Sequence, residues 1–255
     1  MLIVISPAKT LDYDTPPATG RYSEPRFLDR SQQLIDNLRN YSALDLADLM
    51  KLSMKLAELN FERYNAWSPP FTPENAKQAV LAMKGDVYTG LDAESFSEED
   101  FAFAQKHLRI LSGLYGVLRP LDLMQPYRLE MGTRLLNEHG RDLYAFWGAA
   151  VTEAVNRDLE GQGDDVLINL ASNEYFKSVK PRLVSGRIVT PQFKEAKSGG
   201  YRMIGVYAKR ARGLMSRFII DNRLSDPESI KEFALDGYRW NDALSQGEKW
   251  VFTRG

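Results

Sequence analysis

Short apolar runs at both ends of the chain flank a middle section whose apolar residues recur with helical spacing. Residues 1–5 are all apolar, which is typical of a short strand buried on both faces. Further strand-like runs occur at 166–170, 187–190, 202–206 and 247–253. Strands near both ends, separated by helices, predict a mixed α/β fold whose sheet gathers distant segments.

The middle section carries several amphipathic patterns. Apolar residues three and four positions apart predict helices around 27–38 and 46–59. Ser97, followed three residues later by Asp100, resembles a capping box and predicts the start of another helix. The periodicity continues that helix with these residues facing inward: Phe101, Ala104, Leu108 and Leu111. Helices are also predicted at 144–159 and 208–222.

Composition indicates an ordinary globular protein. Of 255 residues, 44% are hydrophobic and 26% are charged, enough for a substantial core. No low-complexity tract or long linker marks a boundary, so we expect a single domain over residues 1–255.

The absence of cysteine excludes disulfides, thiolate metal sites and a cysteine nucleophile. No apolar run approaches the roughly 18 residues needed to span a bilayer, and the first residues lack the pattern of a signal peptide. We therefore expect no membrane association and a cytoplasmic location.

Charge is segregated along the chain. The net charge is −1, yet eleven Lys and Arg residues lie between Lys177 and Arg217 with Glu195 as the only acid, and six acids lie between Asp86 and Asp100. Such segregation favours binding of a polyanion, either nucleic acid or a phosphorylated small molecule. The alternative is a pair of solvated faces whose charges interleave with acids from elsewhere in the fold.

Three predicted strands lead into small or polar residues followed by a lysine. These lysines are Lys9, Lys177 and Lys209, after the strands at 2–5, 166–170 and 202–206. Ligands of α/β proteins bind at the carboxyl ends of strands, so the three lysines are predicted to converge on an anion. Ordinary strand-to-helix turns with surface lysines are the alternative reading. No Walker motif or GxGxxG specifies a nucleotide.

The segment 111–120 contains two glycines, Gly113 and Gly116, that interrupt a helical pattern. We interpret it as a turn between two helices whose backbone amides hold a phosphate, as in a helix-hairpin-helix element. Arg119 and Arg128 lie close enough in sequence to add positive charge. The alternative is a tight connection kept for packing alone, and the glycine spacing differs by one residue from a common hairpin form.

Neither a cofactor nor a metal is expected. The two histidines, His107 and His139, lie far apart without carboxylates at metal-ligand spacing. No GxSxG motif occurs, and no residue is assigned a catalytic role.

Several long motifs resemble the YaaA family of bacterial peroxide-stress proteins. They occupy residues 6–10, 85–91, 111–131, 169–176 and 207–213. The resemblance implies an unusual α/β fold with a positively charged cleft and a helix-hairpin-helix-like element. It also implies binding of double-stranded DNA and a response to hydrogen peroxide that lowers free intracellular iron.

We therefore interpret the chain as a protein that binds duplex DNA through its backbone. No recognition-helix pattern stands out, so base readout is not expected. The predicted DNA-binding residues are Lys9, Gly113, Tyr115, Gly116, Arg119, Arg128, Lys177, Lys180, Arg182, Lys209, Arg210, Arg212 and Arg217.

Two alternatives remain open. An enzyme acting on a small phosphorylated or nucleoside-like substrate would use a chemically varied set of residues: Tyr88, Tyr115, Tyr127, Arg128, Glu130, Asn169, Ser172 and Lys209. A module that binds a protein partner is the third reading. A shallow basic groove would favour DNA, whereas a closed polar pocket would favour an enzyme.

Overall fold

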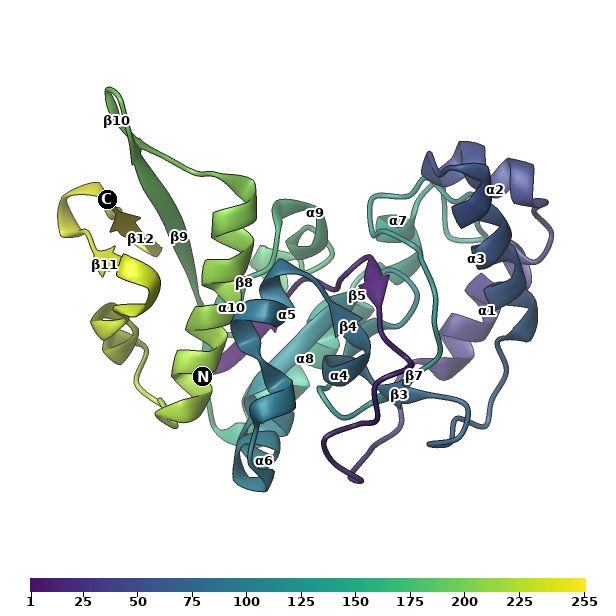
Figure 1. The fold of residues 1–255 in the computed structure, drawn as a ribbon, viewed down its shortest axis with the longest axis horizontal. Coiled ribbons are helices and arrows are strands. Elements are labelled where there is room, and N and C mark those ends of the chain that lie inside the picture. The colour runs from purple at the N-terminus through teal and green to yellow at the C-terminus, as the bar shows by residue number, and fades with distance from the viewer.

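The computed structural model describes residues 1–255 and is built around a mixed eight-stranded sheet (Figure 1). Seven strands follow one another across it in the order β11 (Arg239–Trp240), β12 (Lys249–Arg254), β9 (Arg187–Lys197), β8 (Val166–Leu170), β1 (Leu2–Ile5), β5 (Leu108–Ser112) and β6 (Gly116–Leu118). β10 (Gly200–Arg202) pairs with β9. Two smaller pairs join β2 (Thr10–Leu11) to β4 (Met83–Lys84), and β3 (Lys77–Gln78) to β7 (Leu123–Met124).

The helices lie between these strands in sequence. They are α1 (Leu28–Leu38), α2 (Ala43–Met50), α3 (Met54–Ala66), α4 (Ala79–Ala82), α5 (Asp86–Leu91), α6 (Glu98–His107), α7 (Leu143–Trp147), α8 (Ala150–Gln162), α9 (Asn173–Phe176) and α10 (Gly205–Asp221). Short 3-10 helices occur at Ala93–Ser95, Pro181–Leu183, Pro227–Glu232, Leu235–Gly237 and Asp242–Leu244.

β1 is the centre of the sheet. It runs parallel to β5 on one side and β8 on the other, and all four of its residues are completely buried. An entirely apolar strand is what a parallel strand covered on both faces requires. The strands predicted at 1–5 and 166–170 are thereby confirmed, as is the mixed α/β class.

The remaining elements surround this sheet unevenly. α5 packs along α10, α6 packs against β1 and β5, and α8 packs against β6. α1, α2 and α3 gather at one end of the molecule, whereas β9, β11 and β12 form the other end (Figure 1). The parallel strands in the middle of the sheet therefore lie between an end made of helices and an end made mainly of strands.

Four element predictions fail in detail. The predicted helix at 46–59 is divided, because α2 ends at Met50 and α3 begins at Met54. The chain at 202–206 is not a strand leading into a helix, because β10 ends at Arg202 and α10 begins at Gly205. The predicted helix at 144–159 is divided into α7 and α8 around Gly148, which has φ +54°. The helix after Ser97 has its capping box but ends at His107, because the next residues form the buried strand β5.

Candidate functional site

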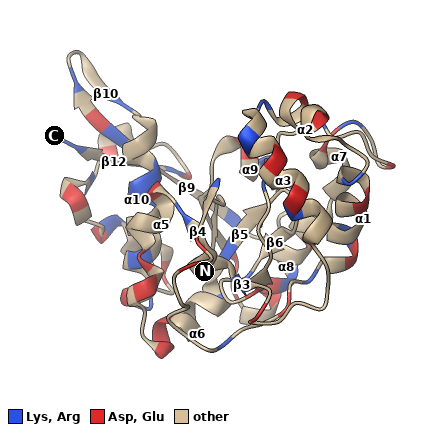
Figure 2. Ribbon diagram, turned by 45° about the vertical axis from the view of Figure 1, so that its right-hand side comes forward, with Lys and Arg blue, Asp and Glu red and all other residues tan.

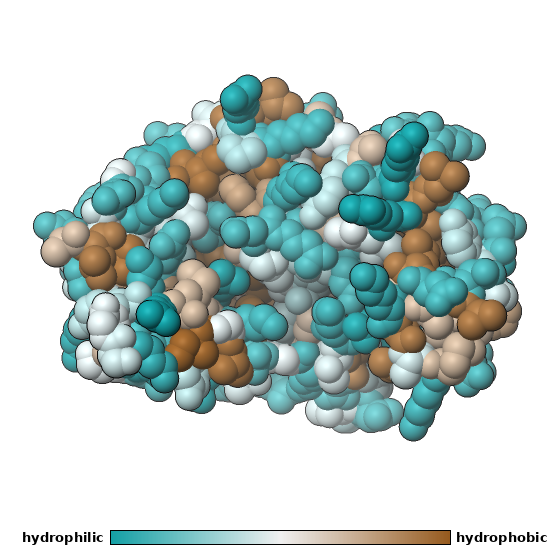
Figure 3. Space-filling model, turned by 90° about the horizontal axis from the view of Figure 1, so that it is seen from above, coloured by the Kyte–Doolittle hydropathy of each residue, from teal (hydrophilic) through white to brown (hydrophobic).

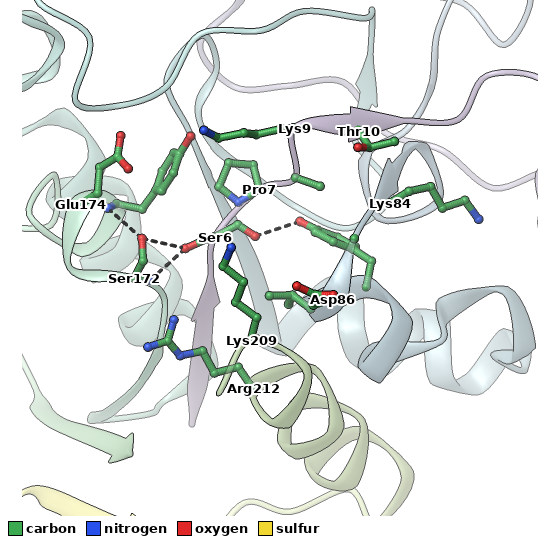
Figure 4. Close-up of a pocket in the computed structure, with 15 residues that line it drawn as sticks. Ser6, Pro7, Lys9, Thr10, Lys84, Asp86, Ser172, Glu174, Lys209 and Arg212 are labelled. Atoms are coloured by element: carbon green, nitrogen blue, oxygen red, sulfur yellow. Dashed lines mark hydrogen bonds between the residues drawn. The ribbon is translucent and has the colours of Figure 1, made fainter. Parts of the chain in front are cut away.

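A cavity of about 400 Å³ opens beyond the carboxyl ends of β1 and β8 (Figure 4). Residues 6–10 and 84–88 line it, together with Ser172, Glu174, Tyr175, Lys209 and Arg212. The lining thus comes from the loop after β1, the start of α5, the start of α9 and the side of α10. Binding sites for small molecules occupy cavities of about 300 to 1,000 Å³, and this position in an α/β sheet is typical of them.

Neighbouring parallel strands place two serines together. Ile5 and Leu170 are paired across β1 and β8, so the two strands end at the same edge of the sheet. Ser6 directly follows β1, and Ser172 follows β8 by two residues. The backbone N–H of Ser172 donates to the Oγ of Ser6 at 2.9 Å, and the two hydroxyl oxygens are 3.3 Å apart. The hydroxyl of Tyr88 donates to the carbonyl oxygen of Ser6 at 3.1 Å. These bonds fix the serines in the cavity wall.

The approach of α10 to α5 brings two cations to the opposite wall. A β-carbon built on Gly213 would lie 1.9 Å from the carbonyl oxygen of Val87, and one on Gly90 would lie 2.3 Å from that of Arg210. Glycine at both positions therefore allows the two backbones to touch. Lys209 and Arg212, one helical turn apart on α10, consequently point toward Ser6 and Ser172 (Figure 4).

The cations of the cavity differ in their partners. Lys9 pairs with Glu130 at 3.1 Å, and Lys84 pairs with Asp12 at 3.4 Å. Lys209 and Arg212 have no carboxylate within ion-pair distance, and burial lowers the pKa of the Arg212 guanidinium. The two cations on α10 are therefore the ones available to an added anion.

The structure separates the predicted DNA-binding residues into groups. Lys9, Lys209 and Arg212 line the cavity, whereas Arg128 lines a smaller neighbouring pocket and pairs with Glu130 at 3.1 Å. Lys177 lies outside the cavity lining with its Nζ 4.5 Å from the centre of the Tyr144 ring. The convergence of three lysines is thus wrong for Lys177 and correct for the other two.

The other predicted cations lie on the surface or in ion pairs. Lys180, Arg182 and Arg210 are exposed. Arg119 pairs with the buried Asp122 at 2.9 Å, and Arg217 pairs with Asp221 at 2.7 Å. Both paired arginines hold parts of the fold together, which reduces their value as contacts for a polyanion.

The prediction of a phosphate-binding turn between helices at Gly113 to Gly116 is wrong. The segment connects β5 to β6 as an antiparallel hairpin. Gly113, Tyr115 and Gly116 are buried, and the N–H of Tyr115 already donates to the Oγ of Ser112 at 2.9 Å. Because a phosphate cannot reach these groups, all three residues serve packing instead of DNA contact.

Two carboxylates were missed by reasoning from the sequence. Asp86 and Glu174 line the cavity, and one oxygen of Glu174 accepts the N–H of Gly132 at 2.9 Å. Each lies within a motif that carried the family resemblance, at 85–91 and at 169–176. Their positions within these motifs could have identified Asp86 and Glu174 as site residues from the sequence.

The chain shows neither a metal-binding cluster nor a membrane-spanning helix. No group of three or more His, Cys, Asp or Glu residues is arranged to hold a metal ion. His107 instead contacts the carbonyl oxygen of Met1 through Nδ1 at 3.0 Å and stacks on Phe103. No helix has the length and apolar character needed to cross a bilayer.

Fold and site together define an α/β protein with a polar, cation-lined cavity at the carboxyl edge of its sheet. The family model described as "Peroxide stress protein YaaA" matches residues 1–244. The chain therefore belongs to this family, and its role lies in the peroxide stress response.

Proposed function

We propose that this peroxide stress protein binds duplex DNA through the phosphate backbone. The observation that supports the proposal is a set of exposed cations in the segment that follows α9 and on α10. None of them has a carboxylate within ion-pair distance: Lys177, Lys180, Arg182, Lys209 and Arg210. Exposed cations without partners are free to neutralise phosphates and release counterions.

The distribution of charge supports a directional field. Lys and Arg occur directly after α9 and on the first half of α10, whereas Asp and Glu gather on α6 (Figure 2). Seen from above, mainly hydrophilic side chains surround a recessed centre (Figure 3). A surface with this arrangement attracts a polyanion to one face and repels it from another.

The lowering of free iron is proposed to be indirect. The chain has no cysteine, and its histidines and carboxylates form no group suited to a metal ion. Tight iron sites normally draw on such ligands. We infer that DNA or another ligand carries the effect on iron, rather than sequestration by this chain.

The salt dependence of DNA affinity tests the proposal. About five neutralised phosphates give a slope of log K against log salt of about −4 to −5. The triple variant Lys180→Ala, Arg182→Ala, Arg210→Ala should flatten this slope to about −2, because each lost contact removes about 0.9. These three residues lie outside the cavity lining, so the cavity remains intact.

A second triple variant provides the matched control. Lys55, Lys106 and Arg157 are also exposed and lie on α3, α6 and α8. Their replacement by alanine removes the same total charge and should leave the slope unchanged. A wild-type slope near zero, or equal slopes for the two triple variants, would refute backbone binding by this face.

A further inference from the structure

Arg212 is a half-buried cation that has no carboxylate partner. The comparison within this chain is Arg109, which is more deeply buried and donates from Nε to Asp158 at 2.6 Å. The guanidinium of Arg212 has neither an ion pair nor a hydrogen bond, and it faces the cavity (Figure 4). A partly desolvated guanidinium without a counterion is stabilised by an anion that binds beside it, and the cavity offers room for one.

Other donors converge on the same position. Lys209 lies on the same face of α10, and Ser6 and Ser172 lie opposite it (Figure 4). The two serine hydroxyls share one hydrogen bond, and each hydroxyl carries a single proton. One hydroxyl proton therefore remains free to donate. A guanidinium, an ammonium and a hydroxyl together match the terminal oxygens of a phosphate.

The remaining polar groups exclude a ligand made only of acceptors. Asp86 forms no ion pair, and Glu174 uses one oxygen for the N–H of Gly132. Both carboxylates line the cavity, so the part of the ligand near them must carry hydrogen-bond donors. A bare phosphodiester backbone has acceptors alone and would be repelled by these carboxylates.

We propose that the cavity binds one nucleotide, with its phosphate at Lys209 and Arg212 and its hydroxyl or amino donors toward Asp86 and Glu174. The volume of about 400 Å³ suits a ligand of this size and is too small for a duplex. The nucleotide is either free or turned out of a DNA strand. Binding of a free nucleotide does not depend on duplex binding by the exposed cations.

Calorimetric titration tests the proposal with nucleoside 5′-monophosphates, the matching nucleosides and inorganic phosphate as probes. We expect at least one monophosphate to bind about tenfold or more tightly than its nucleoside, a difference of about 1.4 kcal/mol. Arg212→Gln should weaken that binding about tenfold. Asp86→Asn should weaken binding of the monophosphate while leaving inorganic phosphate unaffected.

Arg202→Gln is the matched control, because Arg202 is an exposed arginine outside the cavity lining. It removes the same charge and should change nucleotide affinity by less than about twofold. Thermal denaturation of each variant checks that it is folded. Arg212→Lys keeps the positive charge but lacks the planar guanidinium group, so it should bind the nucleotide with intermediate affinity.

Two DNA duplexes distinguish the sources of the nucleotide. One is fully paired and the other contains a single unpaired nucleotide. A preference for the unpaired site that Arg212→Gln abolishes, with no binding of free monophosphates, identifies a nucleotide turned out of DNA. If no monophosphate binds at millimolar concentration and Arg212→Gln leaves both duplex affinities unchanged, the proposal is overturned. The proposal would also be overturned if nucleosides bound as tightly as their monophosphates, because the phosphate would then contribute nothing to affinity.

Discussion

The ring of Trp147 lies directly against Gly116: a β-carbon built on Gly116 would come within 2.7 Å of the ring atom Cζ3. Gly116 also has φ +69°, a conformation that side chains disfavour. The indole Nε1 of Trp147 donates to the carbonyl oxygen of Gly113 at 2.9 Å. Trp147 thus explains Gly116, whereas Gly113 is needed because an added β-carbon would lie 2.1 Å from the carbonyl oxygen of Leu129. Packing explains both glycines of the hairpin without any ligand.

Gly116→Ala should destabilise the protein by more than about 2 kcal/mol, because backbone strain and the clash with Trp147 add together. Gly163 provides a control, since it has φ +68° and nothing within 4 Å of an added β-carbon. Gly163→Ala should therefore lower the free energy of unfolding by about 1 kcal/mol, because only backbone strain is added. Urea denaturation measures both. Equal losses would contradict the role given to Trp147.

Buried Arg109 and half-buried Arg212 should differ in how their charge affects stability. Asp158→Ala leaves Arg109 buried without its carboxylate partner and should lower the free energy of unfolding by about 3 to 5 kcal/mol. Arg212→Gln removes a cation that has no partner, so it should leave stability within about 1 kcal/mol of wild type or raise it. Chemical denaturation without added anions is the measurement. A large loss for Arg212→Gln would mean that its charge is already compensated.

The approach of α10 to α5 should control the cavity. Gly213→Ala places a β-carbon 1.9 Å from the carbonyl oxygen of Val87, which must move α10 away from α5. We expect the free energy of unfolding to fall by about 2 kcal/mol or more, despite the better helix propensity of alanine. Nucleotide binding should also weaken.

Gly205→Ala on the same helix provides the comparison, because an added β-carbon there meets nothing within 4 Å. It should be neutral or slightly stabilising and should not affect binding. Similar results for the two substitutions in thermal denaturation and calorimetry would show that close helix contact does not position Lys209 and Arg212.

His107 should make stability depend on pH. Burial lowers the pKa of its imidazole below the ordinary value of 6.5. As the pH falls below 6.5, the unfolded chain takes up a proton that folded His107 resists, so the free energy of unfolding should decrease. Urea denaturation between about pH 8 and pH 5.5 tests this.

His107→Gln should reduce that pH dependence, whereas His139→Gln should not, because His139 is exposed. A profile that is unchanged by the first substitution, or reduced equally by both, would assign the dependence to other groups.

Local patterns predicted much of the secondary structure. The apolar runs at 1–5 and 166–170 and the capping pattern at Ser97 gave elements that the structure contains. The helix predicted through Leu111 was wrong, because the next strand is buried on both faces and its apolar residues continue the helical spacing by coincidence. Periodicity cannot distinguish these two cases over a few residues.

The sequence by itself determined the fold class, the segregation of charge and the strand ends that supply Ser6 and Ser172, because each depends on neighbours in the chain. Tertiary structure alone decided which cations share a cavity. Lys209 and Arg212 face Ser6 because Gly90 and Gly213 allow α10 to touch α5. Arg119 and Arg217 were equally suitable in sequence, but both are held by carboxylates. Ion pairing and burial are contacts between distant segments, and only the folded chain sets them.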